Sequence, residues 1–428
     1  MGNVKSDTGF TWLNIFYIDV IFGHLHANLR LINSSKLKNL TYTKVTMKRK
    51  QNRYQTETYT FSVQGEAAMP KNYTYTDAGV NRAQRHESKK ALSTLKETYK
   101  HIGFGGIRHL PYSNIFPVSE DTFLDLEIEG VGTKVLVAEL TDKYDTIGID
   151  AVAMVVNDVI RSGAKPLALA DNIHATASEP RLVNAWLKGI IAGAEESECP
   201  IVNGETGDVA EIIKGLTPNS GFDMVVSAIG KVDKPNVITG EGIKPGDPII
   251  GLASSGVHSN GITLVRKVLF KQWGGKYNPT DLPEGLEREV ALEVLEPTKI
   301  YVKPLLKLAR EVKVKAAVHI TGDAFTKFNN LANYSPGIGF EFDNFKPQPI
   351  FGLIQKTAAE QGLTITDEEM FKTFNMGWGF GIIVDKVDID KAMNTLEQYG
   401  VNPERIGKVT EKERVVEIDY QNKHMILT

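Results

Sequence analysis

The sequence predicts an α/β (α+β) fold with two mixed α/β domains, and three observations support this class. Strand-like and helix-like runs alternate after residue 69, which is typical of sheets covered by helices. A stretch dense in Pro and Gly, residues 231–248, separates two blocks that each contain both kinds of run. The 428 residues are enough for two or three domains. We therefore expect an N-terminal domain over residues 69–235 and a C-terminal domain over residues 236–428.

The head of the chain, residues 1–68, differs in composition from the rest. It is basic, and its polar segment at residues 36–60 has no sustained period, which predicts a disordered or loosely attached extension. Met69 is a candidate natural start, which would make the preceding residues extraneous. The apolar run at residues 10–23 is shorter than the roughly 20 residues of a membrane helix and contains polar residues. It also lacks the flanks of a signal peptide, so neither is predicted.

The overall charge and the cysteine count restrict the possible partners and the compartment. A formal net charge of -3 gives no basis for a large electrostatic contact with nucleic acid or an anionic membrane. Small molecules or another subunit are the expected partners. The single cysteine, Cys199, excludes an internal disulfide and a cysteine metal cluster, which predicts a reducing, cytoplasmic location.

The elements of the first domain follow from composition and periodicity. Residues 84–100 are rich in Lys, Glu and Ala and predict a helix. Residues 148–163 place apolar side chains at helical spacing and end on a glycine, which predicts a helix with a buried face. Residues 179–198 predict another helix, with Ser178 as its N-cap and Pro180 in its first turn. The expected strands are apolar runs at residues 124–129, 135–138, 167–173, 200–203 and 222–232.

The second domain alternates in the same way. Its expected strands are at residues 249–253, 316–320, 338–342 and 380–384. Its expected helices are at residues 262–270, 303–311, 350–361 and 389–399.

The segment EGVGTK, residues 129–134, contains the residue types of a phosphate loop in a different order. A phosphate loop needs its lysine before the hydroxyl and at the start of a helix, whereas Thr133 precedes Lys134 and a strand is expected next. The two glycines can still direct backbone N–H groups to an anion, with charge from Lys134 and a cation ligand in Glu129. An ordinary glycine turn between two strands remains an equal alternative.

Further polar residues interrupt apolar runs or follow strands. Asn157 and Asp158 lie in an apolar helix, so they must be hydrogen-bonded or open to a cleft, unless they form a solvated face. Asp158 is a candidate magnesium ligand. Glu205 is expected in a loop directly after a strand, which is a common place for ligand contacts.

Two loops of the second domain carry hydroxyls and histidines. SSGVHSNG, residues 254–261, precedes a helix and can present hydroxyls and N–H groups to a phosphate. The alternative is a capping loop with Ser259 or Asn260 as N-cap. HITGDAF, residues 319–325, ends an apolar strand and is weak evidence alone. The signatures H-E-x-x-H, G-x-S-x-G and C-x-x-C do not occur, which argues against common zinc proteases, serine hydrolases and thiol redox enzymes.

Taken in order, these segments resemble one family. YTDAGV, EGVGTK, DTIGID, AMVVNDV, GAKPL, NGET, SSGVHSNG, PTKIYVK, HITG and FNMG are similar to the motifs of the phosphoribosylformylglycinamidine cyclo-ligases, or aminoimidazole ribonucleotide synthetases. The resemblance runs from about Tyr73 to the C-terminus. The chain departs from the usual motifs at Glu129, where Asp is usual, at Asn203, and at Asp323–Ala324, where glycines are usual.

The resemblance implies an ATP- and Mg²⁺-dependent ring closure in purine biosynthesis. ATP would phosphorylate the formamide oxygen of formylglycinamidine ribonucleotide, and the amidine nitrogen would then attack the imidate carbon and displace phosphate. It also implies a homodimer in which the first domains pair around a sheet- or barrel-like interface.

The resemblance further implies roles for individual residues. The expected ATP-binding residues are Glu129, Gly130, Val131, Gly132, Thr133, Lys134, Asp150, Asn157, Asp158 and Glu205, with Asp158 and Glu129 on the metal. The expected substrate-binding residues are Ser254, Ser255, Gly256, His258, Ser259, Asn260, Thr321 and Gly322. The expected catalytic residues are His258, Lys134 and His319, with His258 as the main acid/base candidate.

Two alternatives remain open. The chain could be another member of the wider ATP-binding superfamily, similar to thiamine-monophosphate kinase or selenide-water dikinase. The first usually lacks the full SSGVHSNG and FNMG set, and the second usually needs a cysteine or selenocysteine in an N-terminal glycine-rich loop. The chain could also be a catalytically silent nucleotide-binding subunit, because of its departures at Glu129 and Asp323–Ala324.

Overall fold

The computed structural model describes residues 71–427 continuously and, before them, six strands. These strands are β1 (Gly2–Lys5), β2 (Thr11–Asn14), β3 (Tyr17–Ile21), β4 (His24–Asn28), β5 (Asn39–Lys50) and β6 (Arg53–Gln64), which pair antiparallel as β1–β2, β3–β4 and β5–β6. The chain divides into two compact units, Met1–Lys71 and Asn72–Thr428. The strands β5 and β6 cover most of residues 36–60, the segment expected to be disordered or loosely attached. The expectations about Met69 and the remainder of the head lie outside the described residues.

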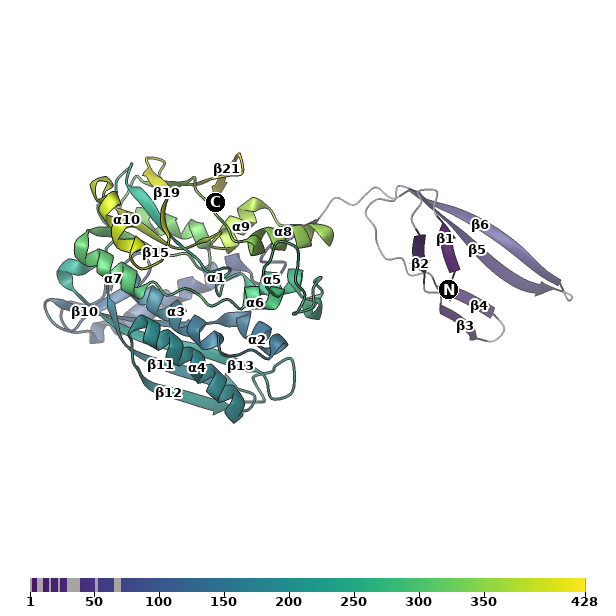
Figure 1. Ribbon diagram of the computed structural model, residues 1–428, viewed down its shortest axis with the longest axis horizontal. Coiled ribbons are helices and arrows are strands. Elements are labelled where there is room, and N and C mark those ends of the chain that lie inside the picture. The colour runs from purple at the N-terminus through teal and green to yellow at the C-terminus, as the bar shows by residue number, and fades with distance from the viewer. Residues whose placement is uncertain are drawn as a thin grey trace. The chain divides into compact units, whose positions relative to one another are not determined.

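The second unit begins with a six-stranded mixed sheet in the order β12-β11-β13-β10-β9-β8. Its strands are β8 (Arg108–His109), β9 (Asn114–Pro117), β10 (Thr122–Gly130), β11 (Lys165–Ala175), β12 (Ile201–Asp208) and β13 (Phe222–Asp233). Only β11 and β12 pair in parallel. The helices α3 (Ile147–Val159) and α4 (Pro180–Ser197) lie side by side over this sheet (Figure 1).

A second, seven-stranded sheet follows in the order β15-β18-β14-β19-β16-β20-β21. Its strands are β14 (Pro248–Ala253), β15 (Val314–His319), β16 (Gly339–Phe342), β18 (Trp378–Val384), β19 (Pro403–Thr410), β20 (Val416–Tyr420) and β21 (Lys423–Leu427). Its helices are α5 (Ile262–Leu269), α6 (Val290–Val294), α7 (Val302–Glu311), α8 (Pro349–Glu360), α9 (Asp367–Thr373) and α10 (Ile389–Glu397). The expected α/β (α+β) class with two sheet-containing parts is confirmed.

Residues 71–75 contact the part of the chain that contains the seven-stranded sheet. β7 (Lys71–Asn72) pairs with β17 (Leu363–Thr364), and the backbone N–H of Tyr75 donates to Glu369 Oε1 at 2.8 Å. α1 (Arg82–Lys90) and the 3₁₀ helix η1 (Ala91–His101) follow and together occupy the region of the expected helix at 84–100.

Close glycine contacts fix the packing of α3 against α4. A Cβ atom added to Gly148 would lie 2.2 Å from the backbone nitrogen of Ile190, and one added to Gly189 would lie 2.5 Å from the carbonyl oxygen of Asp145. The backbones of the two helices thus approach so closely that only glycine fits at positions 148 and 189. The ring of Trp186 stacks on Phe222 of β13 and joins α4 to the sheet.

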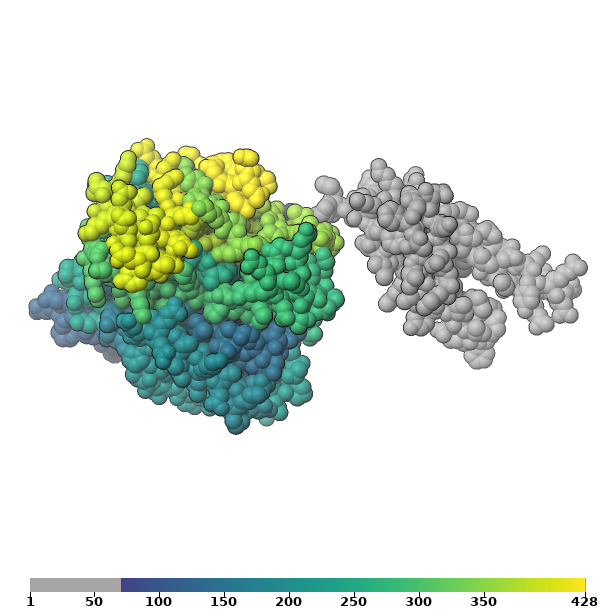
Figure 2. Space-filling model, viewed as in Figure 1, coloured from purple at the N-terminus to yellow at the C-terminus, as the bar shows by residue number. Residues whose placement is uncertain are grey.

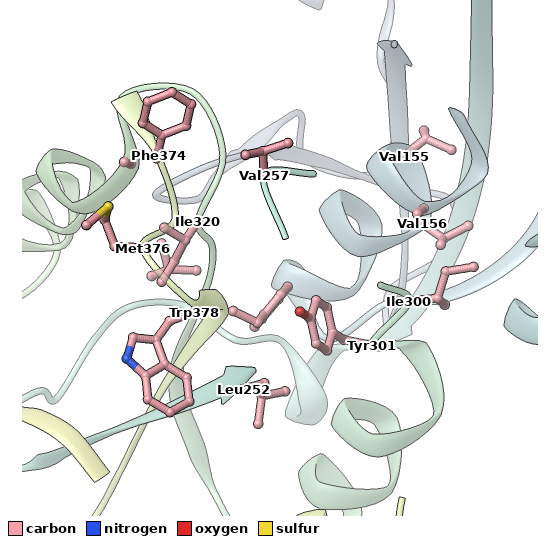
Figure 3. Close-up of a cluster of buried hydrophobic side chains, with 14 of the residues drawn as sticks. Val155, Val156, Leu252, Val257, Ile300, Tyr301, Ile320, Phe374, Met376 and Trp378 are labelled. Carbon is pink, nitrogen blue, oxygen red and sulfur yellow. The ribbon is translucent and has the colours of Figure 1, made fainter. Parts of the chain in front are cut away.

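The two sheets share a hydrophobic core. Val155 and Val156 of α3 belong to one cluster of buried hydrophobic side chains with Leu252, Tyr301 and Trp378, which come from the part of the chain that contains the seven-stranded sheet, here called the second half (Figure 3). The atoms of the two halves are packed directly against each other (Figure 2). In the described residues, no helix has the length and apolar character needed to cross a membrane.

Three local expectations were wrong. Residues 135–138 form the start of the helix α2 (Val135–Thr141) rather than a strand, because a short apolar run has no period that separates the two. Ser178 does not cap α4, since its hydroxyl donates to Asp208 and Glu179 holds the N-cap position. Residues 203–208, expected as a loop, continue β12 alongside β11.

Candidate functional site

A cavity of about 460 Å³ opens where α1, the first sheet and the loops of the second half meet. Most of its lining side chains are polar or charged. The lining residues are Tyr75, Arg82, Arg85, Lys89, Leu110, Pro111, Tyr112, Ser113, Asn114, Glu127, Glu129, Met154, Asp158, Arg161, Asn260, Gly261, Thr321, Gly322, Asp323, Lys327, Asn330 and Thr373. Five predicted residues therefore meet here: Glu129, Asp158, Asn260, Thr321 and Gly322.

Acidic side chains of β10 form one wall. Asp125, Glu127 and Glu129 alternate along the strand, so they share the face opposite to the exposed Leu126 and Ile128. Burial raises the pKa of Glu127 to about 8, and the charge of Arg161 only partly opposes this. Burial and the nearby charge of Asp158 also raise the pKa of Glu129.

Asp158 is held in a buried charged cluster on α3. Its Oδ2 atom lies 2.8 Å from Nη2 of Arg161, and its Oδ1 atom lies 2.7 Å from Nδ1 of His319. Burial alone would raise the pKa of Asp158, but Arg161 and His319 outweigh it and lower this pKa to about 2. The carboxylate is therefore ionised at neutral pH and already has a partner on each oxygen.

Lys327, in the 3₁₀ helix η6 (Ala324–Asn333), is another cation that lines the cavity. Its ammonium donates to the carbonyl oxygen of His319 at 3.2 Å and to the hydroxyl of Thr321. Burial lowers the pKa of Lys327 to about 8, against the opposing charge of Asp158.

Lys134 does not lie in the cavity. Its side chain is fully buried, and its Nζ atom lies 2.9 Å from Oδ1 of Asp150 and 2.7 Å from the carbonyl oxygen of Glu296. Asp150 also accepts from Ser259 Oγ at 3.0 Å and from the backbone N–H of Thr298 at 2.7 Å. Lys134 and Asp150 thus join the first sheet's part of the chain to loops of the second half, and the predicted contact of Lys134 with ATP phosphates stays a prediction.

Asn157 has a similar connecting role. Its Nδ2 donates to the carbonyl oxygen of Lys299 at 2.8 Å, and its Oδ1 accepts from the backbone N–H of Tyr301 at 2.9 Å. This explains how a polar side chain is buried in the apolar helix α3.

The SSGVHSNG loop contributes mainly internal bonds. Ser254 Oγ bonds to Asn375 at 3.0 Å, Ser255 Oγ bonds to the carbonyl oxygen of Pro297, and the backbone N–H of Ser255 donates to Nε2 of His258 at 3.1 Å. Gly256 has a φ of 153° and the Ser259 hydroxyl bonds to Asp150. Gly261 holds the N-cap position of α5 without a side-chain bond, so neither Ser259 nor Asn260 is the cap.

Both predicted catalytic histidines are buried beside the cavity and do not line it. Burial lowers the pKa of His258 well below its ordinary value, and burial also lowers the pKa of His319 despite its contact with Asp158. Both rings are therefore neutral at pH 7. The ring of His319 contacts the cavity-lining residue Asp158.

The other predicted ATP-binding residues are divided between two places. Gly130 ends β10, Val131 is buried, Gly132 has a φ of 58°, and the hydroxyl of Thr133 lies 3.0 Å from that of Thr263. Glu205 is exposed on the edge strand β12, outside the cavity.

Sequence reasoning missed the cations of the cavity. Arg82, Arg85 and Lys89 lie on α1. Arg161 follows the AMVVNDV motif, and Lys327 follows the HITG motif. The spacing of Arg85 and Lys89 along the helix predicted at residues 84–100 is a usable signal, because residues four apart share a helix face; Arg82 lies before that predicted helix. No sequence signal indicated that this face lines the cavity.

A divalent cation fits the acidic wall of the cavity. No group of three or more His, Cys, Asp or Glu side chains within the described residues could hold a metal alone. Mg²⁺ bound with phosphates usually takes only one or two carboxylates. Glu129 suits this role because it lines the cavity. Burial raises its pKa by destabilising the charged carboxylate, which a bound cation would stabilise. Asp158 suits it less well, because Arg161 and His319 occupy its oxygens.

Comparison with known proteins gives the family. The models for the N-terminal and C-terminal domains of AIR synthase related protein match residues 113–232 and 244–419. A phosphoribosylformylglycinamidine cyclo-ligase of Bacillus pumilus is 40% identical over 354 residues, which cover 80% of this chain and 96% of that protein. The chain belongs to the phosphoribosylformylglycinamidine cyclo-ligase family.

Other members of the cyclo-ligase family align over most of the chain. The protein of that name from Methanocaldococcus jannaschii is 37% identical over 368 residues, which cover 83% of this chain and 99% of that protein. Since these relatives are named as cyclo-ligases, the family is one of ligase enzymes. The solved structure of T. maritima PurL complexed with FGAR matches with a TM-score of 0.50 and 14% identity, over 74% of this chain and 47% of that one. At this identity the likeness concerns the fold alone.

Proposed function

We propose that this cyclo-ligase family member closes the imidazole ring of 5-aminoimidazole ribonucleotide in de novo purine biosynthesis. The substrates are formylglycinamidine ribonucleotide and ATP, and the other products are ADP and phosphate. The main support is the alignment with cyclo-ligases over nearly their whole length, together with a charged cavity built from the motifs that the alignment contains.

In this proposal the cavity holds the transferring phosphoryl group. Formylglycinamidine ribonucleotide attacks the γ-phosphorus of ATP with its formamide oxygen, and ADP leaves. Arg161 and Lys327 supply positive charge next to the acidic wall, where transition-state charge on the phosphoryl oxygens needs compensation. Bound Mg²⁺ would neutralise phosphate charge, with Glu129 as its ligand and Glu127 beside it.

The second step needs a proton acceptor. When the amidine nitrogen attacks the imidate carbon, phosphate leaves and the nitrogen loses a proton. Lys327 and Glu127 line the cavity with pKa values of about 8, which suits proton transfer near neutral pH. We therefore assign proton transfer to this pair. His319 orients Asp158, and His258 braces its own loop.

We further propose a cytoplasmic homodimer that forms through the first sheet. Four large aliphatic side chains on its strands are exposed: Leu126, Ile128, Leu167 and Val202. A cluster of this kind favours burial against another surface, and identical sheets can meet across a two-fold axis.

The test is an assay of the full chain with formylglycinamidine ribonucleotide and Mg-ATP that follows ADP and the aminoimidazole product. We expect one ADP for each imidazole formed. Binding of ATP without any product would instead favour the silent nucleotide-binding subunit. ADP formed with selenide or thiamine monophosphate, and not with the ribonucleotide, would favour the other superfamily members.

A further inference from the structure

α1 carries a row of basic side chains along the face that lines the cavity. Arg82, Arg85 and Lys89 all belong to the cavity lining, and their spacing of three and four residues places them on one side of the helix. The next residue, Lys90, is bonded to Glu87 at 2.6 Å and does not line the cavity.

Two of these cations have no protein partner. Arg82 is engaged, since its Nη1 lies 3.0 Å from Oε1 of Glu369 and its guanidinium lies over the ring of Tyr75. The side chains of Arg85 and Lys89 make no hydrogen bond or salt bridge with any of residues 71–427. Two exposed cations without a hydrogen-bonded or ionic partner among the described residues thus line the cavity.

The acidic wall of β10 is only partly compensated by protein cations, since Glu127 Oε1 lies 3.4 Å from Nη2 of Arg161 whereas Glu129 forms no salt bridge within the described residues. Lys89 contributes attraction to Glu129, but the two side chains form no salt bridge. Glu127 and Glu129 have raised pKa values because positive charge near them does not offset their burial. A ligand with phosphate oxygens toward α1 and a divalent cation toward β10 would satisfy both walls.

Few contacts with the rest of the protein fix the position of α1, so a bound ligand can contribute to it. No residue of α1 or η1 is buried. Its side-chain contacts with the second half are those of Arg82 with Glu369 at its start and of His86, whose Nε2 lies 3.3 Å from Oδ2 of Asp323. A phosphate bonded to Arg85 and Lys89 would add a further attachment that extends to the last turn of α1.

We propose that Arg85 and Lys89 form a phosphate-binding subsite on α1, which holds this helix over a phosphorylated ligand in the cavity. The proposal deepens and rests on the proposed function. The phosphate belongs either to the polyphosphate of ATP or to the 5′-phosphate of the ribonucleotide, since both present the same oxygens to a guanidinium and an ammonium.

The test measures binding to the full chain by isothermal titration calorimetry. The variants are R85Q with K89Q, and the matched control is K90Q, which removes a charge from the same helix outside the cavity. The ligands are Mg²⁺ with a non-hydrolysable ATP analogue, the ribonucleotide alone, and inorganic phosphate. We expect the double variant to bind one of the first two ligands at least about tenfold more weakly, because two charge-assisted hydrogen bonds are lost. K90Q should change binding by less than about twofold.

Hydrogen exchange of residues 82–101 gives a readout independent of turnover. The ligand that loses affinity in the double variant should slow exchange in the wild type and not in the variant, which also identifies the source of the phosphate. Unchanged affinity of the double variant for all three ligands would overturn the subsite, even if the wild type closes the ring. Weakened binding together with no product from the wild type would keep the subsite and reject the proposed reaction.

Discussion

The Nζ atom of Lys134 lies 2.9 Å from Oδ1 of Asp150, and both side chains are fully buried. The pair lies between the helices of the first sheet and the loops that contain Ser259 and Thr298. Its position indicates a structural contribution from a residue that the motif alone associates with phosphate.

We predict that K134A destabilises the fold by roughly 3–5 kcal/mol, because it leaves the buried Asp150 carboxylate without its cation. Denaturant unfolding measures this change. K143A, which removes an exposed partner of Asp145, is the control and should cost less than about 1 kcal/mol. A K134A protein of wild-type stability that no longer binds ATP would favour direct phosphate contact instead.

A second prediction concerns the contact of α3 with α4. G148A should destabilise the chain by about 1–3 kcal/mol or more, because its Cβ would overlap the backbone of Ile190. G352A is the matched control in α8: no atom lies within 4 Å of its added Cβ, so it should stabilise by about 0.5–1 kcal/mol. Equal effects of the two substitutions in thermal unfolding would contradict this packing.

A third prediction uses the raised pKa of Glu127. The folded state holds a proton on Glu127 up to about pH 8, whereas the unfolded chain releases it near pH 4.5, so this group lowers stability as pH rises through that window. E127Q should therefore gain stability relative to wild type, by about 1–3 kcal/mol more at pH 8 than at pH 5.

Unfolding in urea at both pH values checks this difference. E205Q removes an exposed carboxylate of β12 and controls for the loss of a charge. An E127Q effect that is the same at pH 5 and pH 8 would argue against a burial-raised pKa at Glu127.

The exposed face of the first sheet leads to a fourth prediction. Ile128 is 64% exposed on β10, and I128D should convert a dimer into a monomer because it places a charge in an apolar contact. Sedimentation equilibrium gives the mass. V387D changes another exposed aliphatic residue, in the 3₁₀ helix η7 (Lys386–Asp388), and should leave the dimer intact. A dimer that withstands I128D would place the interface elsewhere.

Several of these features could be predicted from the sequence. The apolar spacing of residues 148–163 predicts α3 because a long periodic run has few alternatives. The ordered motifs gave the family, since each motif supports the others. Asp158 is predicted as a polar residue within an apolar helix and Glu129 as a cation ligand in the EGVGTK segment, and both line the cavity.

The remaining features depend on tertiary contacts. Residues 135–138 are too short for periodicity to separate a strand from the start of α2. Lys134 bonds to the backbone of Glu296, which lies 162 positions further along the chain, so no local pattern could predict its burial. The cations of α1 face the cavity only because β17 and Glu369 hold the start of the described segment.

The fate of the formamide oxygen tests the account most directly. The full chain is supplied with Mg-ATP and formylglycinamidine ribonucleotide labelled with ¹⁸O in its formyl group, and the phosphate is analysed by mass spectrometry. The account predicts that the label appears in inorganic phosphate, with one labelled phosphate for each imidazole, because the phosphorylated oxygen leaves in the ring-closing step. Imidazole formed with unlabelled phosphate, or no imidazole at all, would contradict it.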